Sequence, residues 1–237
     1  TGGHRYADAE TNDPDPILNG KPMSWSEIAS DLSKLEENSK VDIDLNGSAI
    51  IPAEVLKQIK DKKISANLNI TSYASWIIDG DRIKSDTAYA DLSLPAGTSL
   101  LKGARGIAGY RFTTGGNNVD AKLRIKFKNE YAGKFANLYF IKDGGAEFIS
   151  TAGIAEDGYV TLSGAAAKGE YVVMLCDYSD LPGDVNNDGV LNALDASAIL
   201  NDIIGNTKCA NALMGDFNID GHISAKDASA ILIHIVS

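Results

Sequence analysis

Oxygen-donor side chains recur at fixed spacing in the last 55 residues of the chain, Gly183 to Ser237. Two stretches, GDVNNDGVLNALDASAIL and GDFNIDGHISAKDASAIL, begin at Gly183 and Gly215 and are offset by 32 residues throughout. In each stretch Asp and Asn alternate around a glycine, and oxygen donors in such a pattern converge on a hard cation. The segment carries seven Asp, no Glu and two Lys, and its Asp residues are spaced regularly among Leu and Ile. We therefore predict bound cations rather than a solvated acidic tail.

Counted over twelve positions, each stretch matches the calcium loop of an EF-hand. Position 6 is Gly189 or Gly221, which permits the sharp turn, and position 7 offers only its backbone carbonyl, so His222 is not a side-chain ligand. Position 8, Leu191 or Ile223, is apolar and is expected to pair the loops through the core. Mg²⁺ is less suited to a loop with many ligands at a flexible radius. The predicted ligands are Asp184, Asn186, Asp188, Val190, Asn192 and Asp195, and Asp216, Asn218, Asp220, His222, Ser224 and Asp227.

Two features depart from an ordinary EF-hand. Position 12 is Asp195 in one copy and Asp227 in the other, where Glu is usual. A Pro-Gly pair before the first loop forbids an incoming helix, whereas a helix is expected after each loop, over residues 196–204 and 228–236. These departures argue against a calcium sensor of the intracellular type, whose paired helices open a groove.

A duplicated calcium loop with an exiting helix and Asp at position 12, placed after a β-rich region, resembles a dockerin. The resemblance covers residues 183–237, with repeats at 183–204 and 215–236, and the DASAIL continuation looks like that of dockerins from gut anaerobes that digest plant polysaccharide. Dockerins are the modules that attach proteins to cellulosome-type assemblies. The resemblance implies a secreted, extracellular module that binds two Ca²⁺ ions and docks its parent protein onto a cohesin of a scaffoldin or cell-surface anchor. Residues 20–178 resemble the X modules that accompany and stabilise dockerins.

In the dockerin family, cohesin is contacted by loop positions 10 and 11 and helix positions 17 and 18. The two copies agree at positions 10 and 17, but Leu194 is matched by Lys226, and Asn201 by Ile233. We therefore expect one preferred binding mode rather than two equal ones. The residues alone leave open whether positions 17 face the partner or fill the dockerin's own core. The implied cohesin-binding residues are Ala193, Leu194, Leu200 and Asn201, and Ala225, Lys226, Leu232 and Ile233.

The first third of the chain predicts the order α-β-α-β-β after a flexible leader over residues 1–19. Ser24 and Glu27 fit a capping box for a helix that runs to about Glu37. A second helix is expected to start at Pro52, a favoured first helical position. The strands are predicted at residues 41–45, 64–70 and 76–83, the last with a turn or bulge at Asp79-Gly80.

From residue 88 onward the pattern indicates short strands only, separated by glycine-containing turns. The alternation is clearest in AKLRIKF, residues 121–127, where apolar and basic side chains point to opposite faces. Such spacing is typical of a sandwich, so the expected fold class is α+β: a β-sandwich with N-terminal helices, then a small all-α dockerin. The predicted strands are 88–94, 106–113, 121–128, 134–141, 147–150, 158–162 and 170–177.

Composition limits the remaining classes of function. The net charge of −10 argues against nucleic acid or an anionic membrane as a partner. No G-x-S-x-G, HExxH, phosphate loop or Cys–His pair supports an enzyme, although 25 acidic residues precede Gly183 and a glycosidase needs only two. Cys176 and Cys209 can form one disulfide or remain two free thiols, and both alternatives stay open.

The alternative function is a carbohydrate-binding module in the β-rich region. Trp25, Trp76, Tyr73 and Tyr110 are the aromatic residues that could stack on sugars. However, Trp25 lies on the apolar face of the first helix and Trp76 begins an apolar strand. Core packing is therefore the favoured role of both tryptophans.

Overall fold

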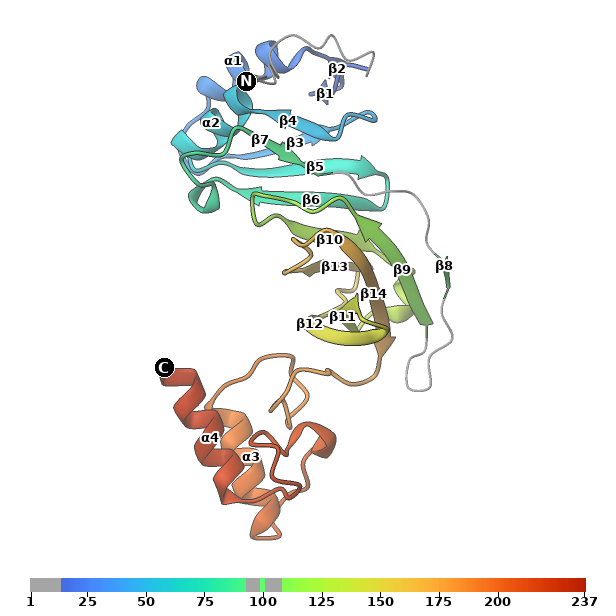
Figure 1. Cartoon of the computed structure of the whole chain (residues 1–237), viewed down its shortest axis with the longest axis vertical. Helices are drawn as coiled ribbons and strands as arrows, with labels where there is room; N and C mark the ends of the chain where they lie inside the picture. The colour runs from blue at the N-terminus through green and yellow to red at the C-terminus, as the bar shows by residue number, and fades with distance from the viewer. Residues whose placement is uncertain (1–13, 93–98, 101–107) are drawn as a thin grey trace.

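The structure, a computed structural model, describes residues 14–92, 99–100 and 108–237. Within them a β-rich N-terminal region is followed by a helical C-terminal region, which lies at one end of an elongated molecule (Figure 1). Most of the predicted leader lies outside the described residues. Its end is ordered, because Ile17–Leu18 forms strand β1 and Leu18 is buried, so the packed region starts before residue 20.

Two helices lie in the first third of the chain. α1 spans Trp25–Ser33 and begins with the predicted capping box: Ser24 Oγ accepts from the Glu27 N–H at 3.3 Å, and Glu27 Oε2 accepts from the Ser24 N–H at 2.9 Å. α2 spans Ala53–Asp61, with Pro52 at the cap instead of the first helical position. Both helices bury their apolar faces in the main core.

Seven strands form a mixed sheet. Its β3 (Lys40–Asp44) and β5 (Ser65–Thr71) run parallel. The connection between them holds β4 (Ile50–Pro52) and α2, because parallel neighbours need a crossover. The predicted α-β-α-β-β order is confirmed by α1, β3, α2, β5 and β6 (Ala74–Asp79). Three short strands within residues 14–92 were not predicted: β1 and β2 (Lys21–Pro22) before α1, and β4, which pairs with β7 (Tyr89–Asp91). The order in the sheet is β13 (Tyr159–Leu162), β10 (Lys122–Lys126), β6, β5, β3, β1 and β2.

A second sheet of five antiparallel strands lies between the first sheet and the C-terminal helices (Figure 1). β13 contacts β11 and β12, and buried residues of both large sheets belong to one hydrophobic core. The order is β12 (Gly145–Gly153), β11 (Phe135–Lys142), β14 (Gly169–Cys176), β9 (Ala108–Thr114) and β8 (Ser99–Leu100).

The predicted strands after residue 113 all occur, with ends shifted by a few residues, and the alternation in 121–127 is confirmed by buried Leu123 and exposed Lys126. Predicted strands 88–94 and 106–113 extend into residues that are not described. The turn or bulge predicted at Asp79-Gly80 is confirmed, because β6 stops at Asp79 and a 3-10 turn, η1 (Gly80–Arg82), follows; the strand does not continue to residue 83 as predicted. A Cβ at Gly80 would lie 2.1 Å from the Ile59 carbonyl oxygen, so the chain turns tightly against α2 there. Two more such turns are η2 (Asn129–Tyr131) and η3 (Ala212–Met214).

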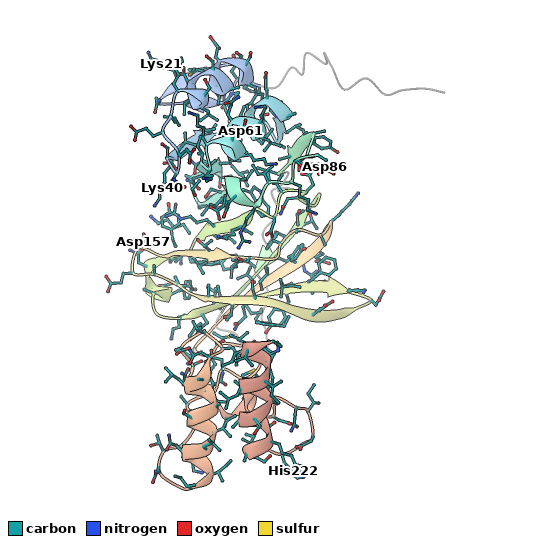
Figure 2. The ribbon with its side chains drawn as sticks, turned by 90° about the vertical axis from the view of Figure 1, so that its left-hand side faces the viewer. Lys21, Lys40, Asp61, Asp86, Asp157 and His222 are labelled. Atoms are coloured by element: carbon teal, nitrogen blue, oxygen red, sulfur yellow. The ribbon has the colours of Figure 1, made fainter. Side chains whose placement is uncertain are left out.

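The C-terminal region holds α3 (Ala193–Ile203) and α4 (Ala225–Val236), which pack side by side (Figures 1 and 2). Each helix begins three residues earlier than predicted, because Asn192 and Ser224 act as N-caps. The region has a small core of its own. That core consists of Val185, Ala196, Ile199, Ala228 and Ile231, each no more than 2% exposed.

Candidate metal centre

The first loop is folded around the carboxylate of Asp184, which is fully buried. Its two oxygens accept hydrogen bonds from the N–H groups of Asp188, at 3.1 Å, and Gly189, at 2.9 Å. The Asn186 side-chain oxygen accepts from the Asp188 N–H at 3.0 Å, and Asp188 Oδ1 accepts from the Val190 N–H at 2.9 Å. Predicted ligands 1, 3 and 5 therefore turn toward the same loop interior.

Position 12 closes the loop and starts the helix. The Asp195 side chain is fully buried; its Oδ1 accepts from the N–H groups of Val185, at 3.1 Å, and Asn186, at 3.3 Å. Its Oδ2 accepts from the Asn192 N–H at 2.9 Å, which completes a capping box at the start of α3. One carboxylate therefore ties the beginning of the loop to the first turn of the helix.

The second loop repeats the main hydrogen bonds of this network. Asp216 accepts from the N–H groups of Asp220, at 3.0 Å, and Gly221, at 2.9 Å. Asp227, also fully buried, accepts from the N–H groups of Asn218, at 3.1 Å, and Ser224, at 2.9 Å. The 32-residue repeat in sequence is thus a repeat of backbone geometry.

Two positions in each loop take the left-handed backbone conformation. Position 6 does so with Gly189 (φ 81°) and Gly221 (φ 87°), as the sharp turn requires. Position 4 does so with Asn187 (φ 62°) and Ile219 (φ 59°). Asn tolerates this conformation, whereas a β-branched residue there is an outlier.

The carboxylates of the loops concentrate negative charge in a small space. Burial raises the pKa of Asp195, and the nearby carboxylates of Asp184 and Asp188 add to the effect. Burial also acts on Asp227, but hydrogen bonds from Asn218 and Ser224 outweigh it and lower its pKa. Among the ion pairs of the described residues, none involves a loop carboxylate.

The donor chemistry fits calcium. Side-chain and carbonyl oxygens alone make up the predicted set, and buried carboxylates need a cation or a hydrogen bond. Within the described ranges, no group of three or more His, Cys, Asp or Glu side chains is placed to hold a metal by itself. In the predicted ligand set, Asn at position 3 and the backbone carbonyl at position 7 would add to the carboxylates.

Comparison with known families decides the identity of this region. The family model of the Dockerin type I domain matches residues 182–236. This segment is a dockerin type I domain. Dockerin type I domains bind calcium and cohesin modules, and they are non-catalytic. No curated protein and no solved structure matches the chain.

The residues expected to contact cohesin all lie on the dockerin surface. Leu200 and Leu232 are 44% and 42% exposed, so they do not fill the dockerin core. Leu194 and Ile233 are more exposed still, at 64% and 68%. The other four are also exposed: Ala193, Asn201, Ala225 and Lys226.

The two position-8 residues, which are expected to pair through the core, differ in burial. Leu191 packs against the dockerin core, whereas Ile223 is 41% exposed. His222 is exposed, and its N–H donates to Asp220 Oδ1 at 3.1 Å, in keeping with a backbone role. It lies at the end of the molecule farthest from Lys21 (Figure 2).

The two tryptophans belong to the core of the N-terminal region. Trp76 is fully buried, and its Nε1 donates to the Leu92 carbonyl oxygen at 2.9 Å. Trp25 is half-buried against the same core. Of the four aromatic residues considered for sugar stacking, Tyr73 is the exposed one, at 51%.

Neither cysteine forms a disulfide, so the free-thiol alternative is the one the structure contains. Burial raises the pKa of Cys209 to about 11, and a hydrogen bond with Asp202 adds to the shift. Among the described residues, no helix is long and apolar enough to cross a lipid bilayer.

Sequence reasoning missed three buried or half-buried residues: Ser179 in front of the dockerin, Asn187 in its first loop, and Asn211 between its two repeats. They hold the segment that joins the two regions. The sequence held one signal for Asn187. Position 4 of the loop is not a ligand and is Ile219 in the second copy, so an asparagine there is not needed by the loop itself and indicates a contact outside it.

Proposed function

We propose that this chain is a non-catalytic assembly module that attaches its parent protein to a cohesin of a scaffoldin or cell-surface anchor. The observation that carries the proposal is the same hydrogen-bonded loop, built twice at a 32-residue offset and closed each time by a fully buried aspartate, Asp195 or Asp227. Each loop holds one Ca²⁺ ion, bound by Asp184, Asn186, Asp188, Val190, Asn192 and Asp195 in loop 1 and their counterparts in loop 2. The setting is an extracellular complex that degrades polysaccharide.

The β-rich region serves as an X module of β-sandwich type that supports the dockerin. Its support for this role is physical continuity: the five-stranded sheet lies next to the dockerin, and Asn137 on β11 bonds the connecting segment. A 55-residue domain with a five-residue core gains from such a neighbour, because small domains bury too little surface to be stable alone.

Titration calorimetry and a cohesin pull-down test the proposal together. We expect two calcium ions per chain, and cohesin capture in calcium that is lost in excess chelator. Capture that is indifferent to chelator would contradict the calcium-dependent mechanism. A panel of cohesins is needed, since the recognition positions differ between copies.

We further propose that one orientation of the dockerin on cohesin is preferred. The exposed surfaces differ at two positions, with Leu194 against Lys226 and Asn201 against Ile233. Replacing Leu194 and Leu200 by Asp in one variant, and Lys226 and Leu232 in another, separates the modes. A preferred mode predicts that only one variant loses affinity; equal small losses would indicate two interchangeable modes.

Carbohydrate binding by the β-rich region is a second candidate. Tyr73 and Tyr110 line an apolar cavity of about 190 Å³ beside Phe127, and an exposed tyrosine is the kind of side chain that packs on a sugar ring. Affinity electrophoresis in gels that contain soluble plant polysaccharides tests this role. Retardation that Tyr73→Ala abolishes supports it, and unretarded migration in every gel removes it.

A further inference from the structure

A short linker, residues 177–181, joins the β-rich region to the dockerin, and asparagine side chains hold its backbone. The first of them is Asn137 on β11, which is fully buried. Its Nδ2 donates to the Tyr178 carbonyl oxygen at 3.0 Å, and its Oδ1 accepts from the Asp180 N–H at 3.0 Å. The sheet therefore holds one side of the linker by two hydrogen bonds.

Loop 1 of the dockerin also hydrogen-bonds this linker, through Asn187. Asn187 Oδ1 accepts from the Ser179 N–H at 2.9 Å, and Asn187 Nδ2 donates to the Asp177 carbonyl oxygen at 3.1 Å. Asn187 stands at position 4, between two predicted ligands, and is not a ligand itself. Its side chain can reach the linker only while the loop keeps its folded conformation.

A third asparagine connects the linker to the first predicted ligand. Asn211, which is 3% exposed, donates from Nδ2 to the carbonyl oxygens of Ser179, at 2.8 Å, and Asp184, at 3.1 Å. Ser179 itself is fully buried. Backbone groups from Asp177 to Asp180 are thus satisfied by side chains, and the Ser179 N–H and the Asp177 carbonyl oxygen would lose Asn187 as their partner if the loop moved away.

The outer surface of loop 1 also packs on the sheet. A Cβ placed on Gly189 would lie 2.9 Å from the Phe135 ring, so the ring rests against the loop backbone. Tyr139 on the same strand hydrogen-bonds Asp180 through its hydroxyl. Loop 1 therefore has two occupied sides, an inner one for the cation and an outer one for the β-rich region.

Loop 2 lacks these outer contacts. Position 4 is Ile219, which is 88% exposed, and a Cβ on Gly221 would meet no atom within 4 Å. The two loops share one internal network and differ in what covers them. Loop 2 therefore serves as a matched control for the outer contacts of loop 1.

We propose that calcium in loop 1 locks the β-rich region and the dockerin into one orientation through Asn187 and Gly189, and that loop 2 has no part in this junction. The inference rests on the proposed binding of calcium at loop 1. Without the cation, the carboxylates of Asp184, Asp188 and Asp195 repel one another, the loop opens, and Asn187 releases the linker. The dockerin then moves freely relative to its neighbour.

The first experiment compares Asp188→Ala with Asp220→Ala, which remove position 5 from loop 1 and loop 2 of the full chain. Chymotrypsin cleavage after Tyr178, measured by mass spectrometry, and small-angle X-ray scattering report the junction. In calcium we expect about tenfold faster cleavage and a longer particle for Asp188→Ala only, as the loss of about one to two hydrogen bonds implies. Equal behaviour of the two variants would overturn the inference.

A second pair of variants changes position 4 of each loop and leaves every predicted ligand intact. It therefore tests the inference even if a ligand variant unfolds the dockerin. Asn187→Ala should bind two calcium ions by calorimetry and still be cleaved about tenfold faster than wild type, whereas Ile219→Ala should match wild type. If Asn187→Ala is cleaved at the wild-type rate, the inference is overturned, but the proposed function still stands. Absence of calcium binding by the wild-type chain instead refutes the proposed function itself.

Discussion

Asp195 and Asn192 cap each other at the start of α3. The Asn192 N–H donates to Asp195 Oδ2 at 2.9 Å, and Asn192 Oδ1 accepts from the Leu194 N–H at 2.7 Å. Because Asp195 also bonds the beginning of the loop, the proposed calcium binding and the start of the helix share one buried side chain. Ser224 and Asp227 repeat the relationship at α4.

Replacing either carboxylate by an amide should remove one calcium ion. For Asp195→Asn and Asp227→Asn we expect a calorimetric stoichiometry of one. The free energy of unfolding in calcium should fall by about 2.7 kcal/mol for each lost ion at 100 times its Kd. Measured in chelator, both variants should lie much closer to wild type, and an equally large loss there would assign the effect to the cap alone.

Adjacent residues on α3 should separate stability from binding. Ile199 is fully buried, so Ile199→Ala should cost about 2–5 kcal/mol and unfold much of the dockerin. Leu200 is exposed, so Leu200→Ala should change the thermal midpoint little and weaken cohesin binding. Circular dichroism and cohesin titration check the pair. A stable Ile199→Ala variant would place the core elsewhere.

The buried hydrogen bond of Trp76 should support the β-rich region alone. Trp76→Phe leaves the Leu92 carbonyl oxygen without its 2.9 Å donor, which should cost about 1–3 kcal/mol in urea unfolding. Calcium stoichiometry should stay at the wild-type value. A loss of calcium binding in this variant would indicate that the two regions unfold as one unit.

Acid should weaken the β-rich region in part through Asp79. The ammonium of Lys122, 2.8 Å away, holds the pKa of Asp79 below its ordinary value of 3.8. A depressed folded pKa means that the stabilisation is complete above about pH 4 and is lost as pH falls through the folded pKa. Urea unfolding followed by tryptophan fluorescence should show a shallower acid dependence for Asp79→Asn. An identical dependence would exclude this pair as a cause.

Cys209 should react slowly with alkylating reagents in the folded protein. Because burial raises its pKa to about 11 from 9.0, its thiolate fraction at pH 8 should be about a hundredfold lower than that of an unshifted thiol. Iodoacetamide labelling followed by mass spectrometry measures the rate. Denaturant should restore ordinary reactivity; equal rates with and without denaturant would show that Cys209 is not buried.

Short-range features followed from the sequence because their partners lie within a few residues. The capping box of Ser24 and Glu27, the oxygen donors around Gly189, and the matching loop at Gly221 need only local backbone turns and one side-chain type at each position. The order of helices and short strands followed for the same reason, since periodicity records which face of an element is buried.

Long-range relationships were decided by the tertiary structure. Ile199 and Leu200 are adjacent and both apolar, and only the packing of α3 on α4 shows which one is buried. The junction is a stronger case, because Asn137 and Asn211 reach the linker across 41 and 32 residues of sequence. An amide side chain can bond any nearby peptide group, so its residue type does not name its partner. The sequence by itself determined two similar loops; the fold decided that one of them faces the β-rich region and the other faces solvent.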